Sequence, residues 1–135
     1  MAVANNAVLR VGVAGLGRLG QRHAAALAYN TPGCKLVAAC SPVEAERAYA
    51  REQLGVEAVY NDLDALLQDK NVDAVVLVTP TSLHADQTIA ALQAGKHVFV
   101  EKPLANTTLD LWQVDNQTKD YSSGNGDFKK RRIVH

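Results

Sequence analysis

Three glycines near the start of the chain have the spacing of a turn that binds dinucleotide phosphates. Gly15, Gly17 and Gly20 form a G-x-G-x-x-G pattern between an apolar run and a helix-like segment. The first glycine allows the tight bend, the second lets a pyrophosphate approach the backbone, and the third lets the helix pack closely. The helix start adds free N–H groups and a partial positive charge. Glycines also occur in ordinary turns, but this position favours nucleotide binding. The residues predicted to bind the cofactor here are Gly15, Leu16, Gly17, Arg18, Leu19 and Gly20.

The residue expected beside the adenosine ribose is Ser41, about 20 residues further on at the end of the second apolar run. An acidic residue at this position binds the ribose hydroxyls and favours NAD. Serine can also bond a hydroxyl, but it does not repel a 2′-phosphate, so NADP remains possible. The absence of an arginine directly after Ser41 favours NAD slightly, because Arg47 is expected on the following helix. Alternatively, Ser41 is only a helix cap ahead of Pro42.

A polar segment also follows the fourth predicted strand, at the sheet edge where such folds bind ligands. It reads V-T-P-T-S-L-H over residues 78–84, and its predicted cofactor contacts are Thr79, Pro80, Thr81 and His84. The alternative is that Thr81 or Ser82 merely caps a helix and that His84 is a polar residue of its first turn.

A second polar segment, E-K-P, follows the fifth predicted strand and adds Glu101, Lys102 and Pro103 at the same edge. A lysine ammonium beside a nicotinamide can orient or polarise a substrate hydroxyl, and burial can lower its pKa. Lys102 is therefore the candidate catalytic residue, although a lone lysine after a strand usually has no such role.

The elements that must position these residues alternate between strand and helix along the chain. This alternation predicts an α/β fold, a Rossmann-type doubly wound parallel sheet of order 3-2-1-4-5 with helices on both faces. Pro42 is expected in the first turn of the second helix and Gly55 at its end, and Asn61 or Asp62 is expected to cap the third. Strands are predicted over 8–14, 35–40, 56–60, 73–78 and 97–101, and helices over 18–29, 43–54, 63–68 and 83–94.

The composition changes near the C-terminus. Residues 1–117 are predicted to form one dinucleotide-binding domain that includes a helix from Thr107 or Thr108 to about residue 117. Residues 118–135 are polar, glycine-rich and basic, which predicts a mobile tail or, alternatively, a short sixth strand at residues 133–134. Without a sixth strand, the exposed edge of the fifth would favour self-association.

Composition excludes several other classes of function. The net charge is +0, so nucleic-acid or membrane-surface binding is not expected, and the basic run at 129–132 is most simply a solvated chain end. Cys34 and Cys40 do not form a C-x-x-C pair, so buried reduced thiols are expected, with no metal site and no disulfide. No apolar run is long enough for a membrane span, and the N-terminus does not resemble a secretory signal. These features predict a cytoplasmic protein.

Taken in order, three stretches resemble the N-terminal domain of the glucose–fructose oxidoreductase, inositol dehydrogenase and rhizopine-catabolism (Gfo/Idh/MocA) family. They are residues 11–27, 36–56 and 72–105, and the resemblance covers about residues 8–105. Its most specific motifs are the glycine turn, T-P-x-x-x-H and A-G-K-H-V-x-x-E-K-P. The sequence A-C-S before residue 42 is most similar to inositol-dehydrogenase-like members.

The resemblance implies an NAD(P)-dependent oxidoreductase that moves hydride between nicotinamide and a secondary alcohol of a sugar or cyclitol. It also implies that Lys102 touches substrate and supports proton transfer, and that Pro103 fixes the turn that carries it. Family members continue beyond this length with an α/β domain that forms most of the substrate pocket and carries an acid/base histidine. That domain is expected to be missing here, so the chain is expected to bind dinucleotide, to take substrate only if the domain is supplied, and to turn over poorly. The alternative is a non-catalytic nucleotide-binding module that pairs with another chain.

Overall fold

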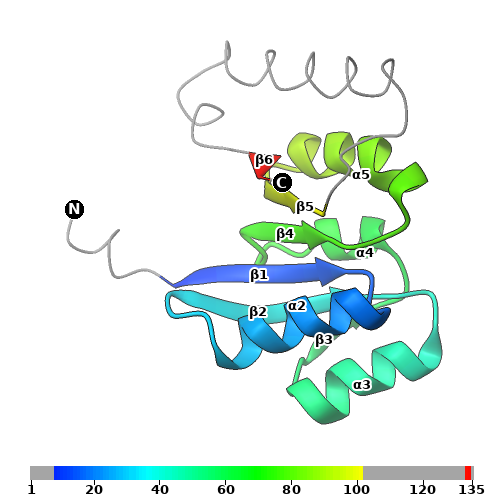
Figure 1. The fold of residues 1–135 in the computed structure, drawn as a ribbon. Coiled ribbons are helices and arrows are strands. Elements are labelled where there is room, and N and C mark those ends of the chain that lie inside the picture. Colours follow the sequence, from blue (N-terminus) through cyan, green and yellow to red (C-terminus); the bar gives the residue numbers. More distant parts are fainter. Residues whose placement is uncertain (1–7, 102–132, 135) are drawn as a thin grey trace.

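A computed structural model describes residues 8–101 and 133–134 of the chain (Figure 1). Strands and helices alternate along it, as predicted. The strands are β1 (Leu9–Ala14), β2 (Cys34–Cys40), β3 (Ala58–Tyr60), β4 (Ala74–Leu77), β5 (His97–Val100) and β6 (Ile133–Val134). The helices are α2 (Arg18–Tyr29), α3 (Glu44–Leu54), α4 (Leu63–Leu67) and α5 (Thr81–Gln93).

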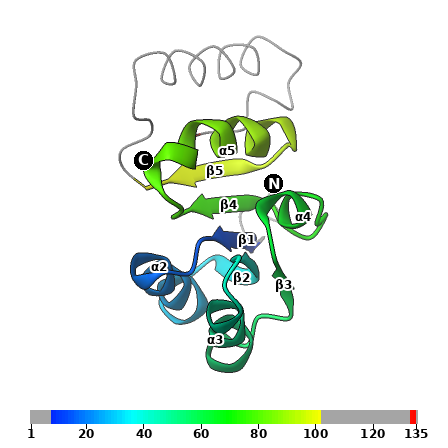
Figure 2. The same ribbon diagram turned by 90° about the vertical axis from the view of Figure 1, so that its right-hand side faces the viewer.

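The described strands lie parallel in one sheet of order β3-β2-β1-β4-β5-β6. Figure 2 shows the order of the first five, which confirms the prediction. β1 lies at the centre between β2 and β4. Strands β2 and β3 are added on one side of β1, and β4 and β5 on the other, so the order of the strands reverses between β1 and β4. β6 pairs with β5 at Val98 and Phe99. The expectation of an open β5 edge is therefore wrong at these two positions, and the alternative of a short sixth strand is confirmed.

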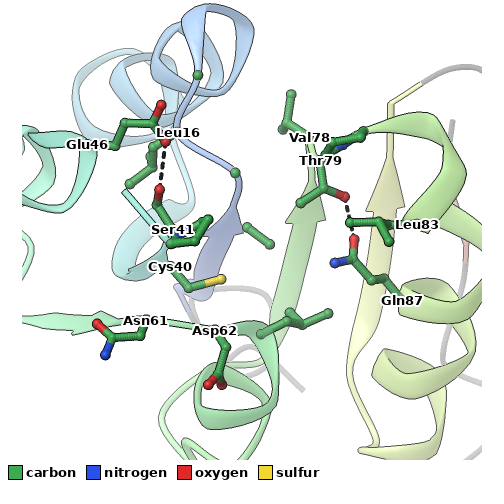
Figure 3. Close-up of a pocket in the computed structure, with 16 residues that line it drawn as sticks. Leu16, Cys40, Ser41, Glu46, Asn61, Asp62, Val78, Thr79, Leu83 and Gln87 are labelled. Atoms are coloured by element: carbon green, nitrogen blue, oxygen red, sulfur yellow. Dashed lines mark hydrogen bonds between the residues drawn. The ribbon is translucent and has the colours of Figure 1, made fainter. Parts of the chain in front are cut away.

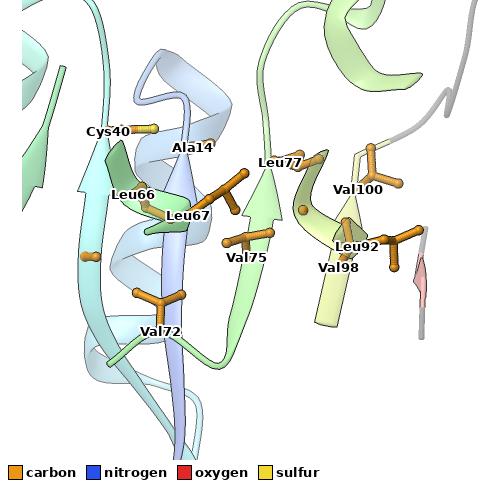
Figure 4. Close-up of a cluster of buried hydrophobic side chains, with 12 residues drawn as sticks. Ala14, Cys40, Leu66, Leu67, Val72, Val75, Leu77, Leu92, Val98 and Val100 are labelled. Carbon is orange, nitrogen blue, oxygen red and sulfur yellow. The ribbon is translucent and has the colours of Figure 1, made fainter. Parts of the chain in front are cut away.

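The apolar residues of the sheet divide into two cores because successive side chains point to opposite faces. On one face, Val75 and Leu77 of β4 pack with Leu66 of α4 and Leu92 of α5 (Figure 4). On the other face, Val76 of the same strand packs in a cluster that contains residues of α2 and α3. β4 is buried along its whole length, as its unbroken apolar sequence predicts.

The helix ends show where the local sequence signals are reliable. α3 ends at Gly55, whose φ of 68° is left-handed, and Asp62 rather than Asn61 caps α4 by accepting a bond from the Ala65 N–H at 2.9 Å. Pro42, however, precedes the α3 N-cap and does not lie in its first turn.

The predicted helix from Thr107 or Thr108, the basic run at 129–132, Lys102 and Pro103 lie outside the described residues. Within the described part of the chain, every helix is too short or too polar to cross a lipid bilayer.

A buried lysine fixes the loop at the end of the sheet opposite the carboxyl ends of the strands. Lys96 is only 7% exposed, and its Nζ donates to the carbonyl oxygens of Asp69 at 2.8 Å and Val72 at 2.7 Å. Burial lowers the pKa of Lys96, and the nearby carboxylates of Asp69 and Asp73 oppose that shift. Lys96 therefore joins the start of β5 to the loop that leads into β4.

We expect Lys96→Met to lower the free energy of unfolding by about 2–3 kcal/mol, because two buried carbonyls lose a charged donor. Chemical denaturation measures the loss. The matched control is Lys70→Met, which removes an exposed lysine from the same loop. Equal stability of the two variants would contradict a bridging role for Lys96.

Candidate functional site

A cleft of about 670 Å³ opens at the carboxyl ends of β1, β2 and β4 (Figure 3). This is where open parallel sheets bind ligands, next to the point at which the strand order reverses. The glycine turn forms its floor, the loops after β2 and β3 form one wall, and the loop after β4 with α5 forms the other. Its volume is within the usual range for small-molecule sites.

The glycine turn is packed so tightly that two of its positions exclude any side chain. Gly15 has a φ of 96°, and a Cβ added there would lie 2.6 Å from the Val78 carbonyl oxygen. A Cβ at Gly20 would lie 2.0 Å from the Gly15 carbonyl oxygen. The first turn of α2 therefore rests directly on the turn that precedes it.

Gly17 differs from these two glycines because the space above it is open. A Cβ there would meet nothing within 4 Å, yet Gly17 lies in the cleft lining and is the N-cap of α2. The first N–H groups of a helix have no partner within the helix, so they can donate to an anion in this space. The turn is held in shape from below, because Gln21 Nε2 donates to the Leu16 carbonyl at 3.1 Å and the Leu16 side chain is fully buried.

Of the other predicted residues of this turn, Leu16 lines the cleft although its side chain belongs to the core. Arg18 and Leu19 are exposed in the first turn of α2 and do not line the cleft.

Ser41 lies at the end of β2 in the cleft lining, but its side chain is only 2% exposed. Its Oγ accepts a bond from the Val43 N–H at 3.0 Å and donates to Glu46 Oε1 at 2.6 Å. The hydroxyl therefore organises the start of α3, as in the alternative of a local cap, although the N-cap of that helix is Val43.

The wall after β4 is organised by a buried histidine. The ring Nε2 of His84 lies 2.7 Å from the Thr79 carbonyl oxygen, and the Thr79 hydroxyl donates to Gln87 Oε1. Thr79 and Pro80 line the cleft, whereas His84 is 2% exposed and lies behind them. The alternative of a cap at Thr81 or Ser82 is wrong, because α5 begins at Thr81 with Pro80 as its N-cap.

Glu101 ends the described part of the second polar segment, and its carboxylate is turned toward α2. Its Oε2 lies 2.9 Å from His23 Nε2, a pair that is about one-third exposed. His23 also contacts the ring of Phe99. Because Lys102 follows Glu101 in the chain, this contact joins the segment to the helix of the glycine turn.

Cys40 lies in the cleft lining behind Ser41, and burial raises the pKa of its thiol to about 12. It is therefore a neutral thiol near pH 7. Both cysteines are free, but the expectation that both are buried is confirmed only for Cys40, because Cys34 is half-buried. The described residues contain no group of three or more metal-ligating side chains.

Several cleft residues were missed by the sequence analysis. Glu46 lies in the first turn of α3, where a carboxylate is usually solvated, and its hydrogen bond to Ser41 gives no sequence signal. The other missed residues lie in the segment after β3 or on α5, and no sequence motif marks them. The missed residues are Glu46, Asn61, Asp62, Leu63, Leu83 and Gln87.

The chain matches one family model, described as an oxidoreductase family with an NAD-binding Rossmann fold (GFO_IDH_MocA), over residues 9–121. It is 45% identical over 96 residues to scyllo-inositol 2-dehydrogenase (NAD(+)) of Bacillus subtilis, covering 71% of this chain and 28% of the relative. It is 40% identical over 112 residues to myo-inositol 2-dehydrogenase of Thermotoga maritima, covering 82% and 33%.

Among solved structures, the chain is similar to scyllo-inositol dehydrogenase from Lactobacillus casei with bound NAD(H) and scyllo-inositol. The TM-score is 0.85 at 36% identity, covering 93% of this chain and 35% of that one. The chain thus spans about a third of the length of these relatives.

We expect a substitution at Gly20 to destabilise the fold more than the same substitution at Gly17. Gly20→Ala should lower the free energy of unfolding by about 1–3 kcal/mol, because the new Cβ collides with a backbone carbonyl. Gly17→Ala should change it by about 1 kcal/mol at most, because its surroundings are open and only the N-cap preference is lost. Thermal and chemical denaturation compare the two, and a Gly20→Ala protein as stable as the wild type would contradict the packing described here.

The raised pKa of Cys40 predicts a loss of stability at alkaline pH. Between its usual pKa of 9.0 and the folded value of about 12, the unfolded chain releases the thiol proton while the folded chain retains it. The free energy of unfolding should therefore fall with rising pH, by up to about 1.4 kcal/mol per pH unit from this group. Urea denaturation from pH 8 to 11 should show a shallower fall for Cys40→Ala than for wild type or Cys34→Ala. Parallel curves for all three proteins would refute the prediction.

Proposed function

Because the chain belongs to the Gfo/Idh/MocA oxidoreductase family as an NAD-binding Rossmann domain, we propose that it binds NAD(H) for hydride transfer at a secondary alcohol of a cyclitol such as inositol. The relatives named above are inositol dehydrogenases, and one of them holds NAD(H) and scyllo-inositol. The proposal also assigns the protein to the cytoplasm, a compartment in which two free cysteines stay reduced.

The observation that carries the proposal is the bare backbone at Gly17. A glycine that caps α2 beneath open space, in a cleft of about 670 Å³, suits a pyrophosphate held by N–H groups and the positive end of the helix. Gly15 and Gly20 keep that helix end close to the cleft because neither position has room for a side chain. These residues fit a dinucleotide by shape and by charge.

In this proposal, the two walls of the cleft receive the two halves of the dinucleotide. The adenosine ribose lies beside the wall that contains Ser41, and the nicotinamide lies beside Thr79 and Pro80. His84 acts indirectly, by holding the Thr79 carbonyl from behind the wall. Glu101 similarly acts on the E-K-P segment through its contact with His23.

When bound, the dinucleotide supplies the hydride acceptor or donor for the alcohol carbon. Lys102 is proposed to touch the substrate hydroxyl and to support the movement of its proton, and Pro103 to fix the turn that carries Lys102. These two roles come from the resemblance of the E-K-P segment to the family motif. Most of the substrate pocket and the usual acid/base histidine belong to the second domain of family members.

We therefore expect the 135-residue chain alone to bind NAD(H) weakly and to show little or no dehydrogenase activity. Isothermal titration calorimetry should detect NADH binding with a Kd at or below about 1 mM. Loss of a general acid/base alone slows turnover by about 10²–10⁴-fold, so NADH formation from inositol should be near background.

Gly17→Ala provides the matched control for this titration. It should weaken NADH binding by about tenfold or more while the protein stays folded, because the added methyl group occupies the phosphate space. No heat from the wild-type chain at millimolar NADH would refute the binding proposal. Steady NADH production from inositol would refute the expectation of low activity.

A further inference from the structure

The wall of the cleft beside the end of β2 carries a carboxylate at the place where the ribose-binding acid of a dinucleotide site is expected. In the usual pattern that acid stands at the end of the second strand, where this chain has Ser41 instead. The Glu46 carboxylate, from the first turn of α3, reaches back to this position and lines the cleft. Its Oε1 lies 2.6 Å from Ser41 Oγ (Figure 3).

The hydroxyl of Ser41 is already committed by its own contacts. It accepts from the Val43 N–H at 3.0 Å and donates its single proton to Glu46, and the side chain is 2% exposed. Ser41 therefore positions the Glu46 carboxylate, and its hydroxyl has neither a free proton nor an exposed surface with which to bind a ribose. Glu46 is half-buried, and among the described residues its second carboxylate oxygen accepts no hydrogen bond.

Arg47, which contacts the backbone of Ser41, is not placed to bind a 2′-phosphate. Arg47 Nη1 donates to the Ser41 carbonyl oxygen at 2.8 Å, and Nη2 donates to Glu44 Oε2 at 2.6 Å. The Arg47 side chain is 13% exposed. Its charge is thus paired along the helix and is not directed into the cleft as a site for a 2′-phosphate would require.

We propose that Glu46 is the specificity-determining residue of the cofactor site, which favours NAD over NADP by accepting hydrogen bonds from the adenosine ribose and repelling a 2′-phosphate. A serine at the end of β2 and an acid on the next helix together replace the single acid of the usual pattern. This inference rests on the proposed function, because it requires that a dinucleotide occupies the cleft.

Asp62 is the other carboxylate in this part of the cleft, and its contacts give it a different role. Its Oδ1 accepts from the Ala65 N–H at 2.9 Å and so caps α4. Asp62 adds negative charge at the β3 side and helps to raise the pKa of Cys40, but its capping bond directs it to α4 and not to Ser41. We therefore expect it to contribute less to discrimination than Glu46.

The test compares the affinities of NAD⁺ and NADP⁺ for the 135-residue chain and its variants by calorimetry. Wild type should bind NAD⁺ more tightly than NADP⁺. Glu46→Gln keeps a hydrogen-bonding side chain without the charge, so it should lower the ratio of the NADP⁺ Kd to the NAD⁺ Kd by about tenfold or more. Glu46→Asp, which keeps the charge, should retain the preference for NAD⁺.

Glu52→Gln is the matched control, because it removes one exposed charge from the same helix outside the cleft. Its ratio should equal that of the wild type, and circular dichroism should show all variants folded. Three results would overturn the inference alone: equal wild-type affinity for the two cofactors, an unchanged ratio in Glu46→Gln, or a larger change in Asp62→Asn. A wild-type chain that binds neither cofactor would instead refute the proposed function, and this inference with it.

Discussion

The close contact between the backbone of α2 and the glycine turn is the constraint on which the rest of the structure depends. A Cβ at Gly20 would lie 2.0 Å from the Gly15 carbonyl oxygen, so α2 can begin here only on a bare backbone. This contact brings the N-terminus of α2 to the end of β1, the central strand of the sheet. The end of β4 is fixed by the same turn, because a Cβ at Gly15 would lie 2.6 Å from the Val78 carbonyl oxygen. Both walls of the cleft are thus positioned relative to one helix end.

The sequence predicts the fold well because its strongest signals agree with each other. β4 is an uninterrupted apolar run, α2 lies where the helical periodicity predicts it, and Gly55 ends α3 in the left-handed conformation expected of glycine. Strand bounds differ by one or two residues because pairing, not propensity, sets them: β3 is paired only from Ala58 to Tyr60. The start of α5 was predicted two residues too late, because its N-cap is Pro80, which is not one of the residue types that usually cap a helix.

The site is predicted less completely, since its details depend on side-chain contacts that the sequence pattern does not specify, whether the partners are near or far apart in the chain. The glycine spacing identifies the floor of the cleft, where Gly15 and Gly20 have no room for side chains. The walls depend on hydrogen bonds such as Thr79 to Gln87 and Ser41 to Glu46, which no local pattern indicates. Likewise, the pairing of His23 with Glu101 joins residues that are 78 positions apart. A motif therefore indicates that a residue matters but not whether it contacts a ligand or holds a loop.

The arrangement of charge along the cleft follows from these contacts and makes its two walls electrostatically different. Glu46 and Asp62 make the wall beside β2 and β3 acidic, while the residues that line the wall from β4 and α5 are neutral among those described. Between the walls lies the positive end of α2, above Gly17. The order along the cleft is thus carboxylate, positive helix end, then a neutral wall. A molecule with hydroxyl donors at one end, a diphosphate in the middle and an uncharged amide at the other matches this order. In the proposed complex, this polarity would set the orientation of the dinucleotide and would place its nicotinamide end on the side of the sheet where β5, the strand before Lys102, ends.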